Sequence, residues 1–255
     1  MTLEERKLEL INLYEKSSKH SNYQILPAGI AEIIGSNKVH VKTRYEKERY
    51  EFIQNNIKVE EKSFLDIGGN TGYFTFELLR NGAKHVDFYE GNKEHSEFVQ
   101  KSAEILKVSS KLTVKNEYFQ FNQTQSNSYD TVLLLNVLHH LGDDYGNSEL
   151  SIKEAKIKML EQFNYFYGRT SFIVFQLGFN WKGNRNNCLF ENGTKQELID
   201  FVSDGICKNW AIEKIGIAVR KDKNIVYEYL NDKNIQRDDS LGEFLNRPLF
   251  IIRAK

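Results

Sequence analysis

The sequence predicts an α/β fold with a doubly wound, mainly parallel sheet, an antiparallel last strand and a helical extension at the N-terminus. From residue 63 onward, short apolar runs alternate with longer helical patterns, which is typical of βαβ units. The first 60 residues instead hold an amphipathic segment followed by a long charged run. With 40% hydrophobic and 27% charged residues among 255, the composition is that of a globular protein.

The N-terminal 60 residues are expected to form a helical extension or lid, and residues 61–255 the main α/β domain. A helix is predicted over residues 3–16, with Leu3, Leu10, Ile11 and Tyr14 on one face, and a second over 42–52. Further helices are predicted over residues 73–81, 94–106, 148–165 and 195–204. Strands are predicted at residues 63–67, 85–90, 112–115, 131–136, 171–176, 210–219, 225–229 and 249–253.

Charge, cysteine usage and hydropathy exclude several classes of protein. Basic and acidic residues both total 35, so no net field favours nucleic acid, and we expect no nucleic-acid partner. Cys188 and Cys207 are too few for a disulfide framework, and we interpret both as buried apolar groups in a reducing compartment. The charged N-terminus lacks the apolar core of a secretion signal, and no run approaches the ~18 apolar residues of a membrane span. We therefore expect a cytoplasmic protein without a membrane span and make no prediction of its oligomeric state.

A glycine-rich turn joins the first predicted strand to its helix in the segment Phe64-Leu-Asp-Ile-Gly-Gly-Asn-Thr-Gly-Tyr-Phe74. Gly68, Gly69 and Gly72 permit positive φ angles and let a ligand approach the backbone closely. Asp66 lies at the end of the strand, where it can accept hydrogen bonds from a cationic or hydroxyl-bearing ligand. A phosphate would gain little from this negative charge, and no Gly-Lys-Ser/Thr follows, so the turn does not match a P-loop.

A second acidic residue ends the next predicted strand, in Val86-Asp-Phe-Tyr-Glu90. A carboxylate one βα unit after a glycine turn can bind both hydroxyls of an adenosine ribose. Glu90 fits that role. The alternative is a solvated acid at a strand end.

Together these motifs resemble the class I S-adenosylmethionine (SAM)-dependent methyltransferases, which have a Rossmann-like fold. The turn matches their first motif, Glu90 their ribose-binding acid, and Tyr129–Leu141 their fourth strand with the turn after it. Asn70 departs from the pattern, because many members carry a second glycine there. This variant, followed by Tyr73-Phe74, is similar to the methyltransferase domains that cap bacterial O-antigen polysaccharides and to the carboxy-SAM enzymes that modify the tRNA wobble uridine.

The resemblance implies SAM as cofactor, with the turn holding its methionine part, Glu90 its ribose, and Tyr118 or Phe119 stacking on its adenine. In the polysaccharide-capping relatives, N-terminal segments close over the cofactor, so Arg44, Tyr45 and Arg49 are lid candidates, and we expect all three on one helix. The implied cofactor-binding residues are Asp66, Gly68, Gly69, Asn70, Gly72, Glu90, Tyr118, Phe119, Asn136, Tyr45 and Arg49.

Methyl transfer requires an oriented nucleophile and, for a hydroxyl acceptor, a base. Asn136, His139 and His140 fall at the carboxyl end of the fourth predicted strand, where doubly wound sheets bind ligands. Either histidine can serve as the base. The alternative is that one only packs or caps, because adjacent residues on a helix point about 100° apart. Asp143 and Asp144 follow without a recognisable ligand spacing, so we predict no metal site.

Acceptor contacts are expected in the loop after the fifth predicted strand, residues 176–187, because loops at that edge carry specificity. Trp181 can form an aromatic wall for a sugar, and Lys182, Arg185 and the more distant Arg247 can bind an anionic group. Alternatively, Trp181 packs in the core of an ordinary polar loop.

The sequence therefore predicts a SAM-dependent methyltransferase that methylates a hydroxyl of a polar small molecule or glycan, including anionic or phosphorylated ones. One alternative is a tRNA-modifying enzyme of similar fold, which the absence of net positive charge disfavours. The other is a non-catalytic SAM-binding protein, because a cofactor motif reports binding and not turnover.

Overall fold

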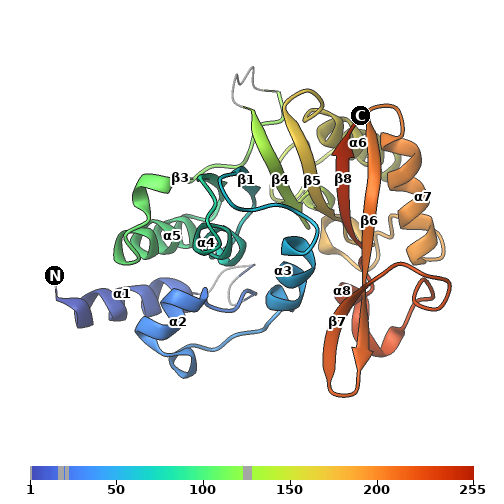
Figure 1. Cartoon of the computed structure of the whole chain (residues 1–255). Coiled ribbons are helices and arrows are strands. Elements are labelled where there is room, and N and C mark those ends of the chain that lie inside the picture. The colour runs from blue at the N-terminus through green and yellow to red at the C-terminus, as the bar shows by residue number, and fades with distance from the viewer. Residues whose placement is uncertain (1, 17–19, 21–22, 123–127) are drawn as a thin grey trace. The chain divides into compact units, whose positions relative to one another are not determined.

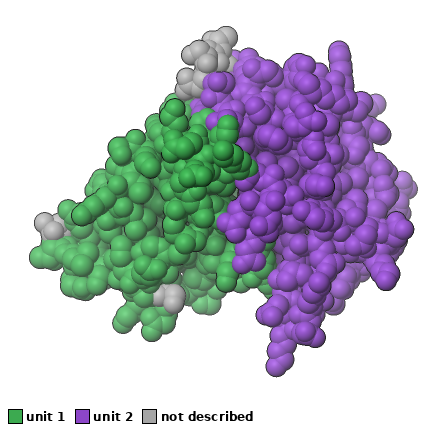
Figure 2. Space-filling model, in the orientation of Figure 1, with its two compact units in different colours: residues 1–50, 58–119 green, residues 51–57, 120–255 purple. Residues whose placement is uncertain are grey.

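The computed structural model describes residues 2–16, 20, 23–122 and 128–255. They belong to two compact units, one made of residues 1–50 and 58–119 and the other of residues 51–57 and 120–255 (Figure 1, Figure 2). The predicted boundary near residue 60 stays a prediction, and each unit is described by itself.

The first unit is built on three parallel strands in the order β3-β2-β1. Helix α4 connects β1 to β2 and helix α5 connects β2 to β3, and α4 packs on β2 while α5 packs on β3 (Figure 1). The elements are β1 (Ser63–Ile67), α4 (Tyr73–Arg80), β2 (His85–Tyr89), α5 (Lys93–Ile105) and β3 (Leu112–Lys115). Strands β1 and β2 are buried almost throughout, which explains their continuous apolar runs.

The N-terminal part of this unit is helical, as predicted, but differs in detail. It contains α1 (Leu3–Glu15), α2 (Ala28–Ile34) and the start of α3 (Glu46–Gln54). Helix α1 packs on α5 through Tyr14, whose ring lies 5.6 Å from that of Phe98. Leu10 and Tyr14 are buried as expected, whereas Leu3 is 56% exposed because the first turn of α1 extends beyond the packed surface. Helix α2 was not predicted.

The second unit combines two parallel strands with three antiparallel ones in the order β4-β5-β8-β6-β7. The last strand of the chain, β8, pairs antiparallel with both β5 and β6. The elements are β4 (Tyr129–Leu135), α6 (Ile152–Asn164), β5 (Thr170–Gln176), α7 (Lys195–Ile206), β6 (Trp210–Lys221), β7 (Asn224–Tyr229), α8 (Gly242–Leu245) and β8 (Leu249–Ala254). This arrangement confirms the α/β class and the antiparallel last strand.

The structure also bears on the predictions for the cysteines and for a membrane span. Both Cys188 and Cys207 are exposed, so interpreting them as buried apolar groups was wrong. Cys188 lies in the polar loop before α7, and Cys207 caps the C-terminal end of α7, where their neighbours leave them open to solvent. Among the helices that the structure describes, none has the length and apolar character needed to cross a membrane.

Candidate functional site

The turn between β1 and α4 adopts the conformation that its glycines predict. Gly68, Asn70 and Gly72 all have positive φ angles, of 65°, 56° and 78°. Asparagine tolerates this region better than most residues, and here its side chain is used as well. Its Oδ1 accepts a hydrogen bond from the amide of Thr71 at 2.9 Å, and its Nδ2 donates to the carbonyl of His20 at 3.0 Å. Asn70 therefore replaces a glycine without loss of the turn.

Gly69 is required by packing. A Cβ at this position would lie 2.3 Å from a ring carbon of Phe88 and 2.9 Å from Oδ2 of Asp66. Contacts this short essentially never occur in proteins, so a larger residue would force the Phe88 ring, the Asp66 carboxylate or the turn itself to shift. The glycine keeps the turn close against the ends of β1 and β2.

Glu90 follows β2 and is fixed to the turn. Its Oε2 accepts a hydrogen bond from the amide of Asn70 at 2.9 Å, and its Oε1 accepts one from the amide of Asn92 at 2.8 Å. An ionised carboxylate accepts hydrogen bonds, and ribose hydroxyls are donors of the kind it binds. The predicted ribose-binding acid and the predicted methionine-binding turn are thus joined directly.

Asp66 is buried at the end of β1 and is 3% exposed. Burial raises the pKa of its carboxyl to about 7, the hydrogen bond that Thr75 Oγ1 donates to Oδ2 at 2.7 Å lowers it, and the charge of Glu90 raises it. A cationic ligand group beside Asp66 would favour the ionised form.

The two aromatic candidates for the adenine differ in position. Tyr118 is 46% exposed and its ring covers Gly91, where a Cβ would lie 2.4 Å from ring carbons. Phe119 is buried, with its ring 5.0 Å from that of Tyr89 at 79°. A flat ligand can reach Tyr118 without unpacking the core, whereas the Phe119 ring is part of the core.

The lid candidates do not share a helix, and that prediction was wrong. Tyr45 has a φ of 57°, which α-helix does not allow, so α3 begins only at Glu46. Arg44 therefore lies in the extended segment before the helix, with its guanidinium 4.7 Å from the ring centre of Tyr23.

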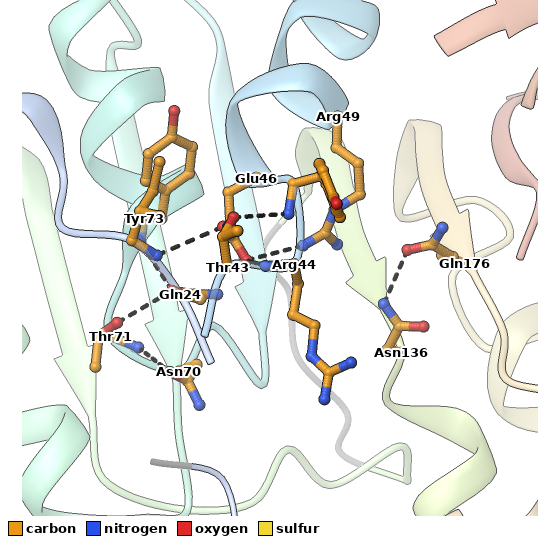
Figure 3. Close-up of polar contacts among 12 residues, drawn as sticks. Gln24, Thr43, Arg44, Glu46, Arg49, Asn70, Thr71, Tyr73, Asn136 and Gln176 are labelled. Atoms are coloured by element: carbon orange, nitrogen blue, oxygen red, sulfur yellow. Dashed lines mark hydrogen bonds and ion pairs between the residues drawn. The ribbon is translucent and has the colours of Figure 1, made fainter. Parts of the chain in front are cut away.

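Arg49 lies on α3 but is buried instead of facing solvent. Its Nη2 is 3.5 Å from Oε1 of the fully buried Glu46, and its guanidinium lies 4.9 Å from the ring centre of Phe74. Glu46 also accepts hydrogen bonds from the amide of Arg44 at 2.8 Å and from Thr43 Oγ1 at 2.9 Å (Figure 3). The charge of Arg49 is thus balanced inside the protein.

Gln24 is a residue of this site that the sequence did not reveal. Its buried side-chain Oε1 accepts hydrogen bonds from the amide of Tyr73 at 3.1 Å and from Thr71 Oγ1 at 3.3 Å (Figure 3). It therefore satisfies an amide in the first turn of α4, next to the glycine turn. No local pattern around residue 24 signals this contact, because it spans 49 residues.

In the second unit, Asn136 belongs to a partly buried polar network. It follows β4 with a φ of 62°, and its Nδ2 donates to Oε1 of Gln176 at 2.9 Å. Its Oδ1 accepts from Nη1 of Arg247 at 2.7 Å, and Arg247 forms an ion pair of 2.5 Å with Glu243. Burial would raise the pKa of Glu243, but the Arg247 guanidinium holds it below its usual range. The charge of Arg247 is thus balanced by Glu243, which favours a positioning role over anion binding.

The two histidines lie in a short 3₁₀ turn, Leu138–His140, after β4. His139 is buried and its Nδ1 accepts a hydrogen bond from the amide of Gly178 at 3.3 Å. His140 is partly exposed, and its Nδ1 lies 3.2 Å from Oδ2 of Asp144. Their ring centres are 4.3 Å apart.

The residues of the predicted acceptor loop differ in burial and in their contacts. Trp181 is buried, and its Nε1 donates to the carbonyl of Leu141 at 2.6 Å. Lys182 lies over the Trp181 ring at 4.3 Å and donates to the carbonyl of Ser148 at 3.0 Å, whereas Arg185 is exposed. Arg185 is therefore the basic residue of this loop that is most open to an acceptor.

A scan against protein-family models finds no match for this chain, and neither does a search of curated proteins. Its structure is similar to a protein from Streptococcus mutans named as a SAM-dependent methyltransferase (15% identity, TM-score 0.53, over 84% of this chain and 49% of that one). A second, named as a methyltransferase and complexed with SAH, gives 16% identity and a TM-score of 0.52 over 81% of this chain and 48% of that one. A protein from Pyrococcus horikoshii named as an RNA methyltransferase gives 13% identity and a TM-score of 0.48 over 99% and 98%.

The chain spans about half the length of the first two of these proteins. At such low identity the likeness concerns the fold, and it does not bear on the O-antigen-capping and wobble-uridine subgroups. This chain has the Rossmann-like α/β fold that these methyltransferases share.

Proposed function

We propose that this protein is a SAM-dependent methyltransferase that methylates a hydroxyl of a polar small molecule or glycan. The observation that carries the proposal is the Glu90 carboxylate, which follows β2 and accepts a hydrogen bond from the Asn70 amide of the glycine turn. A turn without phosphate-binding features, joined to an acid at the next strand end, suits an adenosine ligand with a cationic tail.

The residues of the first unit fit SAM in charge and in shape. Glu90 would hold the ribose hydroxyls, Tyr118 the adenine, and Asp66 with the turn the methionine part. Gly69 and Gly91 allow the Phe88 and Tyr118 rings to lie directly against the backbone beside Asp66 and Glu90, because any Cβ there would collide with these rings. When bound, SAM supplies a methyl group on a positively charged sulfur, which keeps the electron pair of the broken bond.

The second unit carries groups that suit a hydroxyl acceptor. His139 and His140 follow β4, and a histidine is a fitting base near neutral pH. The exposed Arg185 and the partly exposed Lys182 support an anionic or phosphorylated acceptor. Asn70 with Tyr73-Phe74 is similar to the polysaccharide-capping subgroup and equally to the wobble-uridine subgroup, so the glycan acceptor rests on the second unit.

The proposal is tested by incubating the protein with methyl-labelled SAM and fractionated cell extract, with the Glu90→Gln variant as the control for donor binding. We expect label in the small-molecule or glycan fraction with the wild type and none with the variant. Label in small RNA would overturn the acceptor class, and SAM binding without any transfer would make the protein a non-catalytic SAM-binding protein.

A further inference from the structure

The protonation of His139 is fixed by a backbone amide. Nδ1 of His139 accepts the hydrogen bond from Gly178, and this amide is buried. If the ring were turned by 180°, a ring carbon would face the buried N–H of Gly178. The observed orientation therefore satisfies both this amide and Nδ1 of His139. A neutral histidine that accepts at Nδ1 carries its proton on Nε2. His139 therefore presents Nε2 as a donor.

A second proton on His139 is opposed from two sides. It would have to enter at Nδ1, where it would face the N–H of Gly178 inside the protein. Gly178 also lies against Arg247: a Cβ at Gly178 would be 2.9 Å from Nε2 of His139 and 3.1 Å from Cζ of Arg247. A neighbouring guanidinium disfavours an imidazolium. His139 is thus poorly suited to take a proton from an acceptor.

His140 has the opposite surroundings. The amides of Asp143 and Asp144 donate to the carbonyl of His140 at 3.0 and 3.2 Å, and this turn brings both carboxylates back to the ring. Oδ2 of Asp144 lies 3.2 Å from Nδ1 of His140, and Oδ2 of Asp143 lies 3.7 Å from it. The contact with Asp144 is an ion-pair distance that lacks hydrogen-bond alignment at Nδ1. The carboxylates therefore act on the ring through their charge, which favours a proton on Nδ1 and the lone pair on Nε2. They also stabilise the imidazolium that forms when Nε2 takes a proton.

We propose that His140 is the base of the methyl transfer, that Asp144 is its positioning residue, and that His139 serves as a neutral hydrogen-bond donor. The acceptor's O–H proton passes to Nε2 of His140, and the electron pair freed on oxygen forms the new O–CH₃ bond. The methyl group comes from SAM, so the base role rests on the proposed function, whereas the two tautomers do not.

The tautomers can be measured directly by long-range ¹H–¹⁵N NMR of protein labelled with ¹⁵N-histidine, without cofactor or acceptor. His139→Gln and His140→Gln variants assign the signals. We expect His139 to carry its proton on Nε2 and His140 on Nδ1. The wild-type spectrum decides this by itself: a proton on Nδ1 of His139, or on Nε2 of neutral His140, would overturn the assignment.

The role of Asp144 is tested with Asp144→Ala, matched by Asp143→Ala in the same turn. Asp144→Ala is expected to move His140 toward the Nε2-protonated form that free histidine prefers, and Asp143→Ala to change it little. Equal spectra for both variants would contradict the positioning role.

The base role is tested with methyl-labelled SAM and the extract fraction that accepts the label. We expect His140→Gln to lower the rate at least ~100-fold with SAM affinity unchanged, and His139→Gln to lower it far less. Equal losses would overturn the choice of base. Failure of the wild type to transfer label would instead overturn the proposed function, while the NMR result would stand separately.

Discussion

The backbone amide of Asn70 donates a hydrogen bond of 2.9 Å to the carboxylate of Glu90, across 20 residues of sequence. Because Glu90 also accepts from the amide of Asn92, one side chain holds together the glycine turn after β1 and the start of α5. The groups proposed to bind the methionine and ribose parts of SAM are therefore fixed relative to one another before any ligand arrives, which lowers the entropic cost of binding.

Replacing Glu90 with Gln should weaken SAH binding at least tenfold, equivalent to about 1.4 kcal/mol. A glutamine amide keeps one acceptor but turns its NH₂ group toward one of the two backbone donors, and it lacks the charge that strengthens bonds to ribose hydroxyls. Calorimetric titration measures the change. Glu97→Gln is the matched control, because Glu97 lies on α5 with its side chain 45% exposed. Equal affinities for the two variants would contradict the role of Glu90.

Gly91→Ala should weaken SAH binding several-fold while leaving the melting temperature nearly unchanged. The new Cβ would lie 2.4 Å from the ring of Tyr118, which is exposed and can move aside. Displacing the ring removes a stacking surface worth about 1–3 kcal/mol per base. Tyr118→Ala should reproduce the loss and Tyr118→Phe should not. Unchanged affinity in both Gly91→Ala and Tyr118→Ala would exclude Tyr118 from the adenine site.

Asp66→Asn should stabilise the ligand-free protein increasingly as pH rises from about 4 to about 7. Burial raises the pKa of this carboxyl from its ordinary value of 3.8 to about 7 in the folded protein, so in this range the folded state holds a proton that the unfolded state has released. The wild type therefore loses unfolding free energy as pH rises, by a few kcal/mol at most, and the variant does not. Chemical denaturation across this range measures the difference, and a gap independent of pH would contradict the buried-acid assignment.

Glu243→Gln should lower the free energy of unfolding by roughly 1–3 kcal/mol, because it leaves the largely buried Arg247 without its charge partner. Glu213→Gln is the matched control in the same unit. It removes the partner of Arg253, whose side chain is 53% exposed, and should cost about 0–1 kcal/mol. Urea denaturation compares them. Similar losses would show that the network around Asn136 is no stronger than a surface pair.

Most of the strand and helix order was predictable because it rests on local patterns. Strands β1 and β3 begin and end at the predicted residues, β1 because it is a short buried apolar run and β3 because its apolar and polar residues alternate. The glycine turn and Glu90 were predictable for the same reason.

The remaining features depend on contacts distant in sequence. The left-handed Tyr45 delays α3 to residue 46, although nothing in its residue type requires this conformation. Gln24 reaches the turn only because the N-terminal segment folds back upon it. The burial of Arg49 follows from its pairing with Glu46, and the spacing of three residues between opposite charges was the one available signal for it.

Calorimetric titration of the full chain with SAH tests the central claim most directly. The account predicts saturable one-to-one binding that Glu90→Gln weakens at least tenfold and Glu97→Gln leaves intact. A folded wild-type protein that takes up no SAH would contradict it.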